Sequence, residues 1–234
     1  VEKNNCYIRI VDYKSGKPVF SMVELMHGLQ MQLMVYMMAA LQLPLNVPDG
    51  TVKKPAGILF SYLDDPLIEM QDDNPENATR EGQRALRYNG LLLNNPSVLR
   101  AMDGNLEEGS LILPVRTKKD GSFGKSNNLI AEDDFLRLQA YVHKLIKQTV
   151  DKVLKGDIRI QPVKLKKWIA CDQCSYVSIC QYDGKLPDNV TVSLVKMKEE
   201  EALQRMLQQT DYRKEKSHDP LDTAAARGHH NSEP

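Results

Sequence analysis

The segment from residue 22 to residue 43 is apolar on nearly every side, and this limits what the chain can fold into. Its leucine and methionine side chains recur without a polar stripe, and Pro44 and Pro48 end it. A helix of this kind is stable where other elements bury it. A β-rich run at 6–13 precedes the segment and a second apolar run at 55–63 follows it, each ended by turn residues. This order predicts an α/β fold in which a buried helix packs on a sheet.

The rest of the chain predicts shorter elements. Residues 70–80 are polar and predict a mobile loop, and 81–103 predict short helical pieces, one of them capped by Asn95 before Pro96. Further along, the pattern predicts a strand at 110–116, a hairpin turn at Lys119-Asp120-Gly121-Ser122, an amphipathic helix at 132–155 and a charged helix at 195–209. From about residue 210 the chain is polar and without a period, which predicts a disordered tail.

No apolar run predicts a membrane span. The nearest one, from Leu25 to Leu43, is interrupted by His27, Gln30 and Gln32. No secretory signal opens the chain. We therefore expect a cytoplasmic protein without membrane contact.

The charges of the chain are unevenly spread, although the formal net charge is zero. Residues 110–170 carry 13 basic and 6 acidic side chains, and the segments on either side are net acidic. This middle segment is the candidate surface for a polyanion such as DNA. A helix with a solvated lysine face explains part of the same excess.

Asp12 and Lys14 lie two residues apart at the end of the first predicted strand, so their side chains share a face. A carboxylate there suits a hard divalent cation such as Mg²⁺, which usually takes more than one protein ligand. The lysine can stabilise developing phosphate charge or help to activate a water. An ordinary surface ion pair is the alternative for this motif taken alone.

Gln32 and Tyr36 are the polar groups of the apolar segment that fall on one helix face, because they are four residues apart. Buried polar groups need partners, and an active site at the end of the preceding strand would supply them. Two polar residues at the core boundary with local hydrogen bonds are the alternative.

The cysteines Cys171, Cys174 and Cys180 form a C-x₂-C-x₅-C pattern. Two thiolates separated by two residues can hold one metal atom or adjacent irons, and a third nearby fits the same cluster. Three ligands are one short of a complete site, for zinc as for iron–sulfur. Cys6 lies on the first strand and is expected to be a core residue. Three unliganded thiols are the alternative.

Val-Asp-Tyr-Lys-Ser-Gly followed by a helix with Gln-x-x-x-Tyr resembles the nuclease domain of the RecB-like branch of the PD-(D/E)XK superfamily. The resemblance implies a restriction-endonuclease-like core, a mixed sheet flanked by helices. It implies that Asp12 binds the catalytic Mg²⁺ and that Lys14 is catalytic. Gln32 and Tyr36 would form a third motif close to the site and to the DNA.

Residues 157–182, with their cysteines, resemble the end of the B subunit of AddAB-type (RexAB) helicase–nucleases. The same resemblance covers about residues 7–183 and includes Pro-Ala-Gly-Ile-Leu-Phe-Ser-Tyr, Asn-Gly-Leu-Leu-Leu-Asn-Asn-Pro and Lys-Lys-Asp-Gly-Ser-Phe. It implies a [4Fe–4S] cluster held by Cys171, Cys174 and Cys180, with its fourth cysteine far upstream. It also implies an exonuclease that acts on DNA in double-strand break repair by recombination, beside a helicase–nuclease A subunit.

The chain departs from this family pattern because the upstream cysteine, the earlier acidic metal ligand and the helicase-like region are absent. We therefore expect residues 1–183 to be the C-terminal part of a nuclease domain, incomplete at its N-terminal side, with the cysteine segment at 157–183. Residues 184–234 are expected to add a charged helix and a disordered tail. The isolated fragment should be inactive or weak.

Two further interpretations stay open. A Cas4-like iron–sulfur exonuclease shares the nuclease motifs and the split cysteine pattern, although the long insert between Leu63 and Ile130 argues against so compact a protein. The second interpretation is a non-catalytic module that binds DNA as a scaffold and whose fold is held together by a metal cluster.

Overall fold

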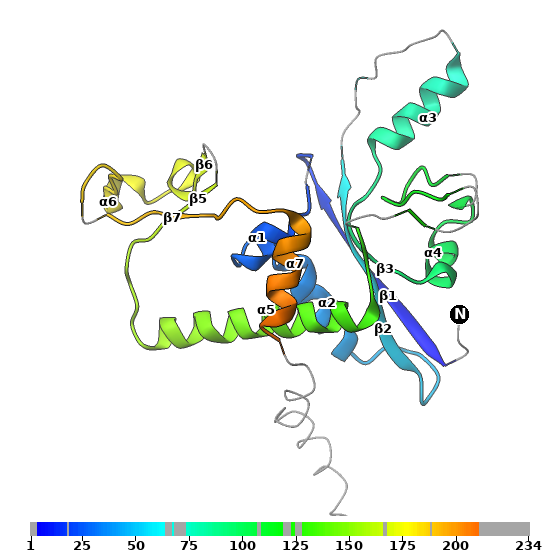
Figure 1. The fold of residues 1–234 in the computed structure, drawn as a ribbon, viewed down its shortest axis with the longest axis horizontal. Helices are drawn as coiled ribbons and strands as arrows, with labels where there is room; N and C mark the ends of the chain where they lie inside the picture. The colour runs from blue at the N-terminus through cyan, green and yellow to red at the C-terminus, as the bar shows by residue number, and fades with distance from the viewer. Residues whose placement is uncertain are drawn as a thin grey trace, which may run out of the picture.

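The computed structural model describes residues 4–17, 19–63, 67, 74–106, 109–118, 123–124, 128–165, 168–187 and 189–210. Its main body is a four-stranded sheet with the order β1-β2-β3-β4 (Figure 1). The strands are β1 (Asn5–Lys14), β2 (Val52–Tyr62), β3 (Asn89–Leu93) and β4 (Leu129–Ile130). β1 and β2 are parallel, β3 is antiparallel to β2, and β4 is parallel to β3. The predicted strands at 6–13 and 55–63 are confirmed, whereas β3 lies where only helical pieces were expected.

The sheet is covered by apolar side chains on both faces. Ile10 pairs with Ile58 and Asp12 pairs with Phe60, so these side chains share one face. That face packs on four helices, α1 (Met22–Met26), α2 (Gln32–Gln42), α5 (Glu132–Leu154) and α7 (Glu199–Gln208). The core between them includes Leu33, Met34, Phe135, Leu138 and Met206. The opposite face is covered by α4 (Pro96–Met102) and the chain after it, through Leu59, Leu92, Leu99, Leu106, Leu113 and Val115.

The long helix expected at 22–43 is wrong, because the segment forms two helices, α1 (Met22–Met26) and α2 (Gln32–Gln42). The backbone turns between them at Gly28 (φ 79°) and Gln30 (φ 53°), where the left-handed conformation ends a helix. The Gln30 amide fills this turn, accepting from Ser21 N–H at 3.1 Å and donating to the Val19 carbonyl at 3.0 Å. His27 and Gln30, which interrupt the apolar pattern, therefore mark the break between α1 and α2.

The predicted helix at 132–155 is confirmed as α5 (Glu132–Leu154), which begins beside the sheet and extends away from it past α1 and α2 (Figure 1). Tyr141 on α5 donates to the Met26 carbonyl at 2.8 Å, which satisfies an acceptor at the end of α1. Arg137 donates to the Leu207 carbonyl at the end of α7 (Glu199–Gln208). These bonds tie three helices together on one face.

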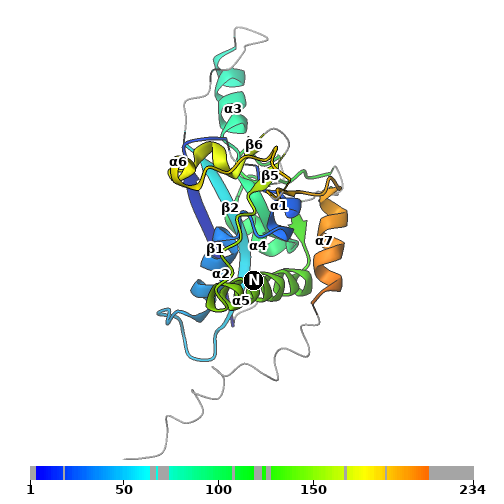
Figure 2. The same ribbon diagram turned by 90° about the vertical axis from the view of Figure 1, so that its left-hand side faces the viewer.

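The charged helix expected at 195–209 is present as α7, and Figures 1 and 2 agree in placing it beside α1 and α5. Ala202, Met206 and Leu207 are buried, the first two in the same core as β1 and α2. The packing of the nuclease-like core therefore does not end at residue 183, because a helix from the 184–234 segment completes it. The tail from residue 211 lies outside the described part of the chain.

The segment between β2 and β4 differs from expectation in two places. α3 (Pro75–Ala85) begins inside the predicted loop at 70–80, because Asn74 caps it by accepting from Glu76 N–H at 3.0 Å. The strand predicted at 110–116 is wrong: those residues form irregular turns, with one bridge between Thr117 and Phe123. The predicted cap at Asn95 is confirmed by its bond from Ser97 N–H at 3.0 Å. The predicted turn at 119–122 lies outside the described residues.

Cys171, Cys174 and Cys180 lie in a small lobe that follows α5 and stands apart from the main sheet (Figure 1). Its sheet has the order β6-β5-β7, formed by β5 (Val163–Leu165), β6 (Trp168–Ile169) and β7 (Val192–Ser193). Cys171 lies in a 3₁₀ turn, η2 (Ala170–Gln173), and Cys174 is the C-cap residue that follows it. Cys180 ends a single helical turn, α6 (Val177–Cys180). Among the helices that the structure describes, none has the length and apolar character needed to cross a bilayer.

Candidate active site at the carboxyl end of β1

The candidate site lies where β1 and β2 end. The two strands are parallel, so their carboxyl ends meet at one edge of the sheet. Asp12 pairs with Phe60 and Lys14 pairs with Tyr62 in the register of the two strands. The side chains of Asp12 and Lys14 both point to the face of the sheet that carries α1 and α2.

Lys14 is the centre of a polar network at this edge. Its Nζ lies 2.7 Å from Asp12 Oδ2 and 3.2 Å from Gln32 Oε1, and it stands 5.7 Å from the centre of the Phe60 ring. The Lys14 side chain is 39% exposed and the Asp12 side chain 19% exposed. The ammonium is thus held by a strand, a helix and an aromatic face while one side of it remains open to solvent.

Gln32 and Tyr36 complete this network from α2. Gln32 Nε2 donates to the Tyr36 hydroxyl at 2.8 Å, while Gln32 Oε1 accepts from Lys14. The structure therefore brings together the four residues predicted for the nuclease site. The expectation that they sit on a fully buried helix is wrong, because α2 buries Leu33, Met34 and Met37 and leaves Tyr36 47% exposed.

The Asp12 carboxylate is suited to be one ligand in the coordination shell of a hard divalent cation. Asp12 Oδ2 is buried and accepts no hydrogen bond from the described residues; Lys14 lies at ion-pair distance, but that contact lacks hydrogen-bond angles. A buried carboxylate oxygen with spare lone pairs is a metal-ligand donor. No group of three or more His, Cys, Asp or Glu side chains in the described ranges is arranged to hold a metal ion. The described site thus offers one ligand of a larger set.

The cysteine site is less complete. Cys171 is half-buried, while Cys174 and Cys180 are exposed. Desolvation is the largest cause that raises the pKa of the Cys171 thiol, and the neighbouring Cys174 and Cys180 raise it further. Within the described part of the chain they do not converge closely enough to hold one metal ion. Cys6 lies on β1 opposite Lys53, in the main sheet and outside this lobe.

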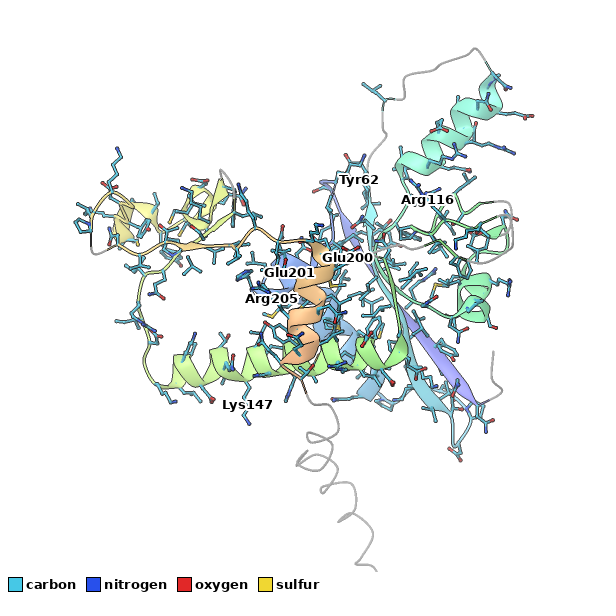
Figure 3. The ribbon with its side chains drawn as sticks, in the orientation of Figure 1. Tyr62, Arg116, Lys147, Glu200, Glu201 and Arg205 are labelled. Atoms are coloured by element: carbon cyan, nitrogen blue, oxygen red, sulfur yellow. The ribbon has the colours of Figure 1, made fainter. Side chains whose placement is uncertain are left out.

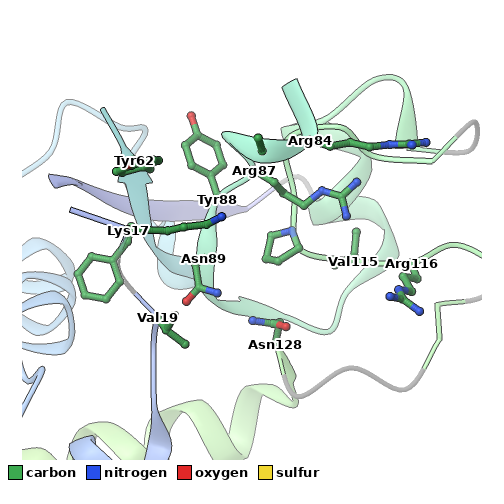
Figure 4. A pocket seen from close by; sticks show the side chains of 13 residues that line it. Lys17, Val19, Tyr62, Arg84, Arg87, Tyr88, Asn89, Val115, Arg116 and Asn128 are labelled. Carbon is green, nitrogen blue, oxygen red and sulfur yellow. The ribbon is translucent and has the colours of Figure 1, made fainter. Parts of the chain in front are cut away.

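A second feature beside Lys14 was not predicted. A pocket of about 490 Å³ opens beyond the ends of β1 and β2, and Lys17, Arg84, Arg87 and Arg116 line it (Figure 4). These four cations come from three segments of the chain, around residues 17, 84–87 and 116, which only the tertiary structure unites. Arg116 belongs to the basic segment at 110–170, but the other three do not. The local signals were Lys17, three residues after Lys14, and the pair of Arg84 and Arg87, three residues apart.

Known proteins resemble this chain over most of its length. It is 37% identical to the B subunit of the ATP-dependent helicase/deoxyribonuclease of Clostridioides difficile (strain 630) over 211 residues, 88% of this chain and 18% of the relative. It is 39% identical to the B subunit of the same enzyme from Clostridium novyi (strain NT) over 196 residues, 83% of this chain and 17% of the relative. The chain thus spans less than a fifth of the length of these relatives.

The match to a protein family covers the main sheet and the part of the lobe that holds the three cysteines. Residues 1–181 match the PD-(D/E)XK nuclease superfamily, a span that holds Asp12, Lys14, Gln32 and Tyr36 as well as Cys171, Cys174 and Cys180. The sheet with helices on its faces agrees with the mixed α/β core that the resemblance implied. With this fold and this match, the chain belongs to the PD-(D/E)XK nuclease superfamily.

Proposed function

We propose that this chain supplies the catalytic core of a metal-dependent DNA exonuclease, as a subunit of a helicase–nuclease that acts in double-strand break repair by homologous recombination. The observation that carries the proposal is the network of Asp12, Lys14, Gln32 and Tyr36 at the carboxyl end of β1. The names of the relatives, each the B subunit of a helicase/deoxyribonuclease, support the same conclusion.

In this proposal Asp12 holds a divalent ion such as Mg²⁺, the class of metal that PD-(D/E)XK nucleases generally use. When bound, the ion activates a water and polarises the phosphodiester. Lys14 presents its ammonium to a phosphate oxygen, where a fixed positive charge stabilises the charge that develops during cleavage. Gln32 holds Lys14 in place through its side-chain oxygen, and Tyr36 accepts from the amide and so fixes which way Gln32 points.

We further propose that the remaining metal ligands come from outside the described residues. Mg²⁺ needs near-octahedral oxygen ligands, and one carboxylate with waters binds it weakly. We expect an earlier acidic ligand upstream of this region, as the family resemblance implies. The 234 residues alone should therefore cleave DNA weakly or not at all, and the activity should be measured in a complete subunit.

A [4Fe–4S] cluster held by Cys171, Cys174, Cys180 and one upstream cysteine is the second part of the proposal. The lobe that carries these thiols has little core of its own, because none of its described residues between 157 and 195 is buried. So small an element usually needs a metal or a disulfide to hold its structure. The place of Cys171, Cys174 and Cys180 on two consecutive turns of this lobe supports a shared site. We place residues 1–183 in the nuclease domain, with α7 packed against it.

The proposed partners are DNA and a helicase–nuclease A subunit, in the cytoplasm. A linear substrate distinguishes this activity from that of an endonuclease, since an exonuclease degrades linear DNA and spares a closed circle. The complete subunit with its partner should degrade linear duplex DNA with Mg²⁺ and stop in EDTA. Asp12→Asn should abolish the cleavage assigned to this subunit, while Asp151→Asn on the exposed face of α5 should retain it.

Persistent cleavage by the Asp12→Asn subunit, with the nuclease of the A subunit inactivated, would contradict the proposed site. If neither variant nor wild type cleaves linear DNA but all three bind it, the chain is a DNA-binding scaffold module.

A further inference from the structure

The pocket beside Lys14 has an unusual balance of charge. Among the described residues that line the pocket, four carry a positive charge and none carries a carboxylate. Figure 4 shows Lys17 on one side of the pocket and the three arginines Arg84, Arg87 and Arg116 on the other. Cations gathered in one hollow repel one another, so the arrangement favours an anion between them.

The pocket adjoins the candidate active site through shared residues. Phe60, whose ring lies under the Lys14 ammonium, also lines the pocket. Tyr62, which pairs with Lys14 in the sheet, lines it as well. Lys17 follows Lys14 by three residues. A strand of DNA whose scissile phosphate meets Lys14 would therefore place a neighbouring nucleotide at the mouth of the pocket.

Arg87 is held rigidly in this pocket. Its guanidinium donates to the Ser110 carbonyl, and the Ser110 hydroxyl donates to Asp103 Oδ2 at 2.6 Å and accepts from Leu113 N–H at 2.7 Å. Asp103 and Ser110 are both buried, so this support is part of the core. A fixed guanidinium loses little freedom when it binds a phosphate.

Arg87 also has one hydrogen-bond donor, its Nε–H group, without an acceptor among the described residues. The Nε atom is buried. Desolvation lowers the pKa of Arg87, and the neighbouring Arg84 and Arg116 lower it further. Arg84 is partly neutralised by Glu81, whereas no ion pair within the described part of the chain neutralises Arg87 or Arg116. A bound anion would relieve this electrostatic cost.

The size and the aromatic lining favour one nucleotide of a single strand. A volume of about 490 Å³ falls within the usual range for a small-molecule site, roughly 300–1,000 Å³. Tyr62 and Tyr88 line the pocket together with the cations (Figure 4). Aromatic rings beside a basic groove are typical of proteins that stack the bases of single-stranded nucleic acid, whereas the backbone of a duplex needs only an open basic surface.

We infer that the pocket formed by Lys17, Arg84, Arg87 and Arg116 binds a nucleotide of single-stranded DNA, with its phosphate at Arg87 and Arg116, beside the scissile phosphate. The identity of the ligand as DNA rests on the proposed function. In this role the pocket positions the strand that is cleaved. It is a binding site and takes no part in the bond-breaking step.

The test is binding of a fluorescent oligothymidine of about 12 nucleotides to the whole chain in EDTA, followed by anisotropy at several salt concentrations. Arg116→Gln should weaken binding about 5- to 10-fold, and should reduce the slope of log K against log salt by about 0.7, the value for one lost contact to a single strand. Lys147→Gln is the matched control. It also removes one exposed positive charge, but from α5, well separated from Arg116 in Figure 3. It should leave the affinity and the slope within the error of wild type.

Arg87→Lys provides a second arm, because it keeps the positive charge and removes the fork of donors. It should weaken oligothymidine binding while circular dichroism and the urea midpoint confirm a folded protein. Unchanged binding by both Arg116→Gln and Arg87→Lys would overturn the inference. An equal loss for blunt duplex DNA of the same length would overturn the assignment to a single strand.

These results are separable from the test of the proposed nuclease. Asp12→Asn should abolish cleavage in the complete subunit and leave oligothymidine binding intact. If Asp12→Asn abolishes cleavage while Arg116→Gln leaves binding unchanged, the pocket assignment fails alone. If Arg116→Gln weakens binding while Asp12→Asn still cleaves, the nuclease assignment fails and the pocket remains a nucleic-acid site.

Discussion

Lys14 Nζ donates to Gln32 Oε1 over 3.2 Å, and this bond joins the last residue of β1 to the first residue of α2. The two residues are 18 apart in the sequence. The turn at Gly28 and Gln30 sets where α2 begins, and therefore where the Gln32 amide points. The ammonium that is proposed to meet the scissile phosphate thus depends on a helix break for its position.

Lys14→Ala in the complete subunit should lower the rate of DNA cleavage by about 100-fold or more, because it removes a fixed positive charge from the reacting phosphate. Affinity for DNA should fall by no more than about fivefold, since one phosphate contact is a small share of backbone binding. Single-turnover cleavage and anisotropy measure the two quantities. Lys147→Ala is the control, and equal cleavage by the two variants would argue against a catalytic Lys14.

Gln32→Leu should slow cleavage about 10- to 100-fold, because Lys14 loses the partner that orients it. Tyr36→Phe should cost less than about fivefold, since Gln32 keeps its bond to Lys14 when the hydroxyl that accepts from its amide is removed. Single-turnover rates at saturating DNA compare the two. A larger loss for Tyr36→Phe would show that the hydroxyl itself acts on the substrate.

Glu199→Gln should lower the free energy of unfolding by about 1–2 kcal/mol. The Glu199 carboxylate accepts from Ser21 Oγ at 3.0 Å and from Met22 N–H at 2.5 Å, so it attaches α7 to the start of α1. Glu200→Gln is the matched control, because Glu200 is the next residue of α7 and is exposed (Figure 3). Its effect should stay within about 0.5 kcal/mol. Urea unfolding of both variants tests whether α7 belongs to the core.

Gly90→Ala should destabilise the protein by about 3 kcal/mol or more. Gly90 has φ 153°, and an added Cβ would stand 2.1 Å from the Ile58 carbonyl oxygen of the neighbouring strand. The substitution therefore separates β2 from β3. Gly104→Ala, where nothing lies within 4 Å, should be nearly neutral. Thermal unfolding that shows equal stability for both would mean that β3 does not pair as described.

The complete subunit should be brown, with iron–sulfur absorption that is lost in Cys174→Ser and kept in Cys6→Ser. Because the pKa of the Cys171 thiol is raised, this thiol holds its proton at neutral pH without metal, and a metal must displace that proton. Loading should therefore weaken as the pH falls and should release protons. Stoichiometric zinc without iron in the purified subunit would contradict the cluster.

The patterns that predicted correctly are local ones. Asp12 and Lys14 share a face because side chains alternate along any strand, and Gln32 and Tyr36 share a face because they are one helical turn apart. The capping at Asn95 and the amphipathic spacing of 132–155 are likewise properties of neighbouring residues. The family pattern then implied that these pairs meet, and the structure places them within hydrogen-bond distance.

The errors arose where long-range packing decides. An apolar segment is typical of one helix, but the amide of Gln30 binds Ser21 and Val19 and so stabilises a break that periodicity cannot show. The run at 110–116 has strand-like residues, yet Arg87 and Asp103 hold it as turns through Ser110. The contact between α7 and α1 could not be read from short windows either, because it depends on Glu199, which accepts from Met22 N–H across 177 positions.

The residue types in short stretches of sequence were enough to predict the superfamily, the strand with Asp12 and Lys14, and the C-x₂-C-x₅-C pattern, because spacing along one element depends on backbone geometry alone. The same stretches could not predict the basic pocket. Its four cations come from three segments: the loop after β1, the stretch that joins α3 to β3, and the chain beyond α4. Only the pairing of β1 with β2 and of β2 with β3 brings these segments to one edge, and charges that meet across a fold leave no period in the sequence.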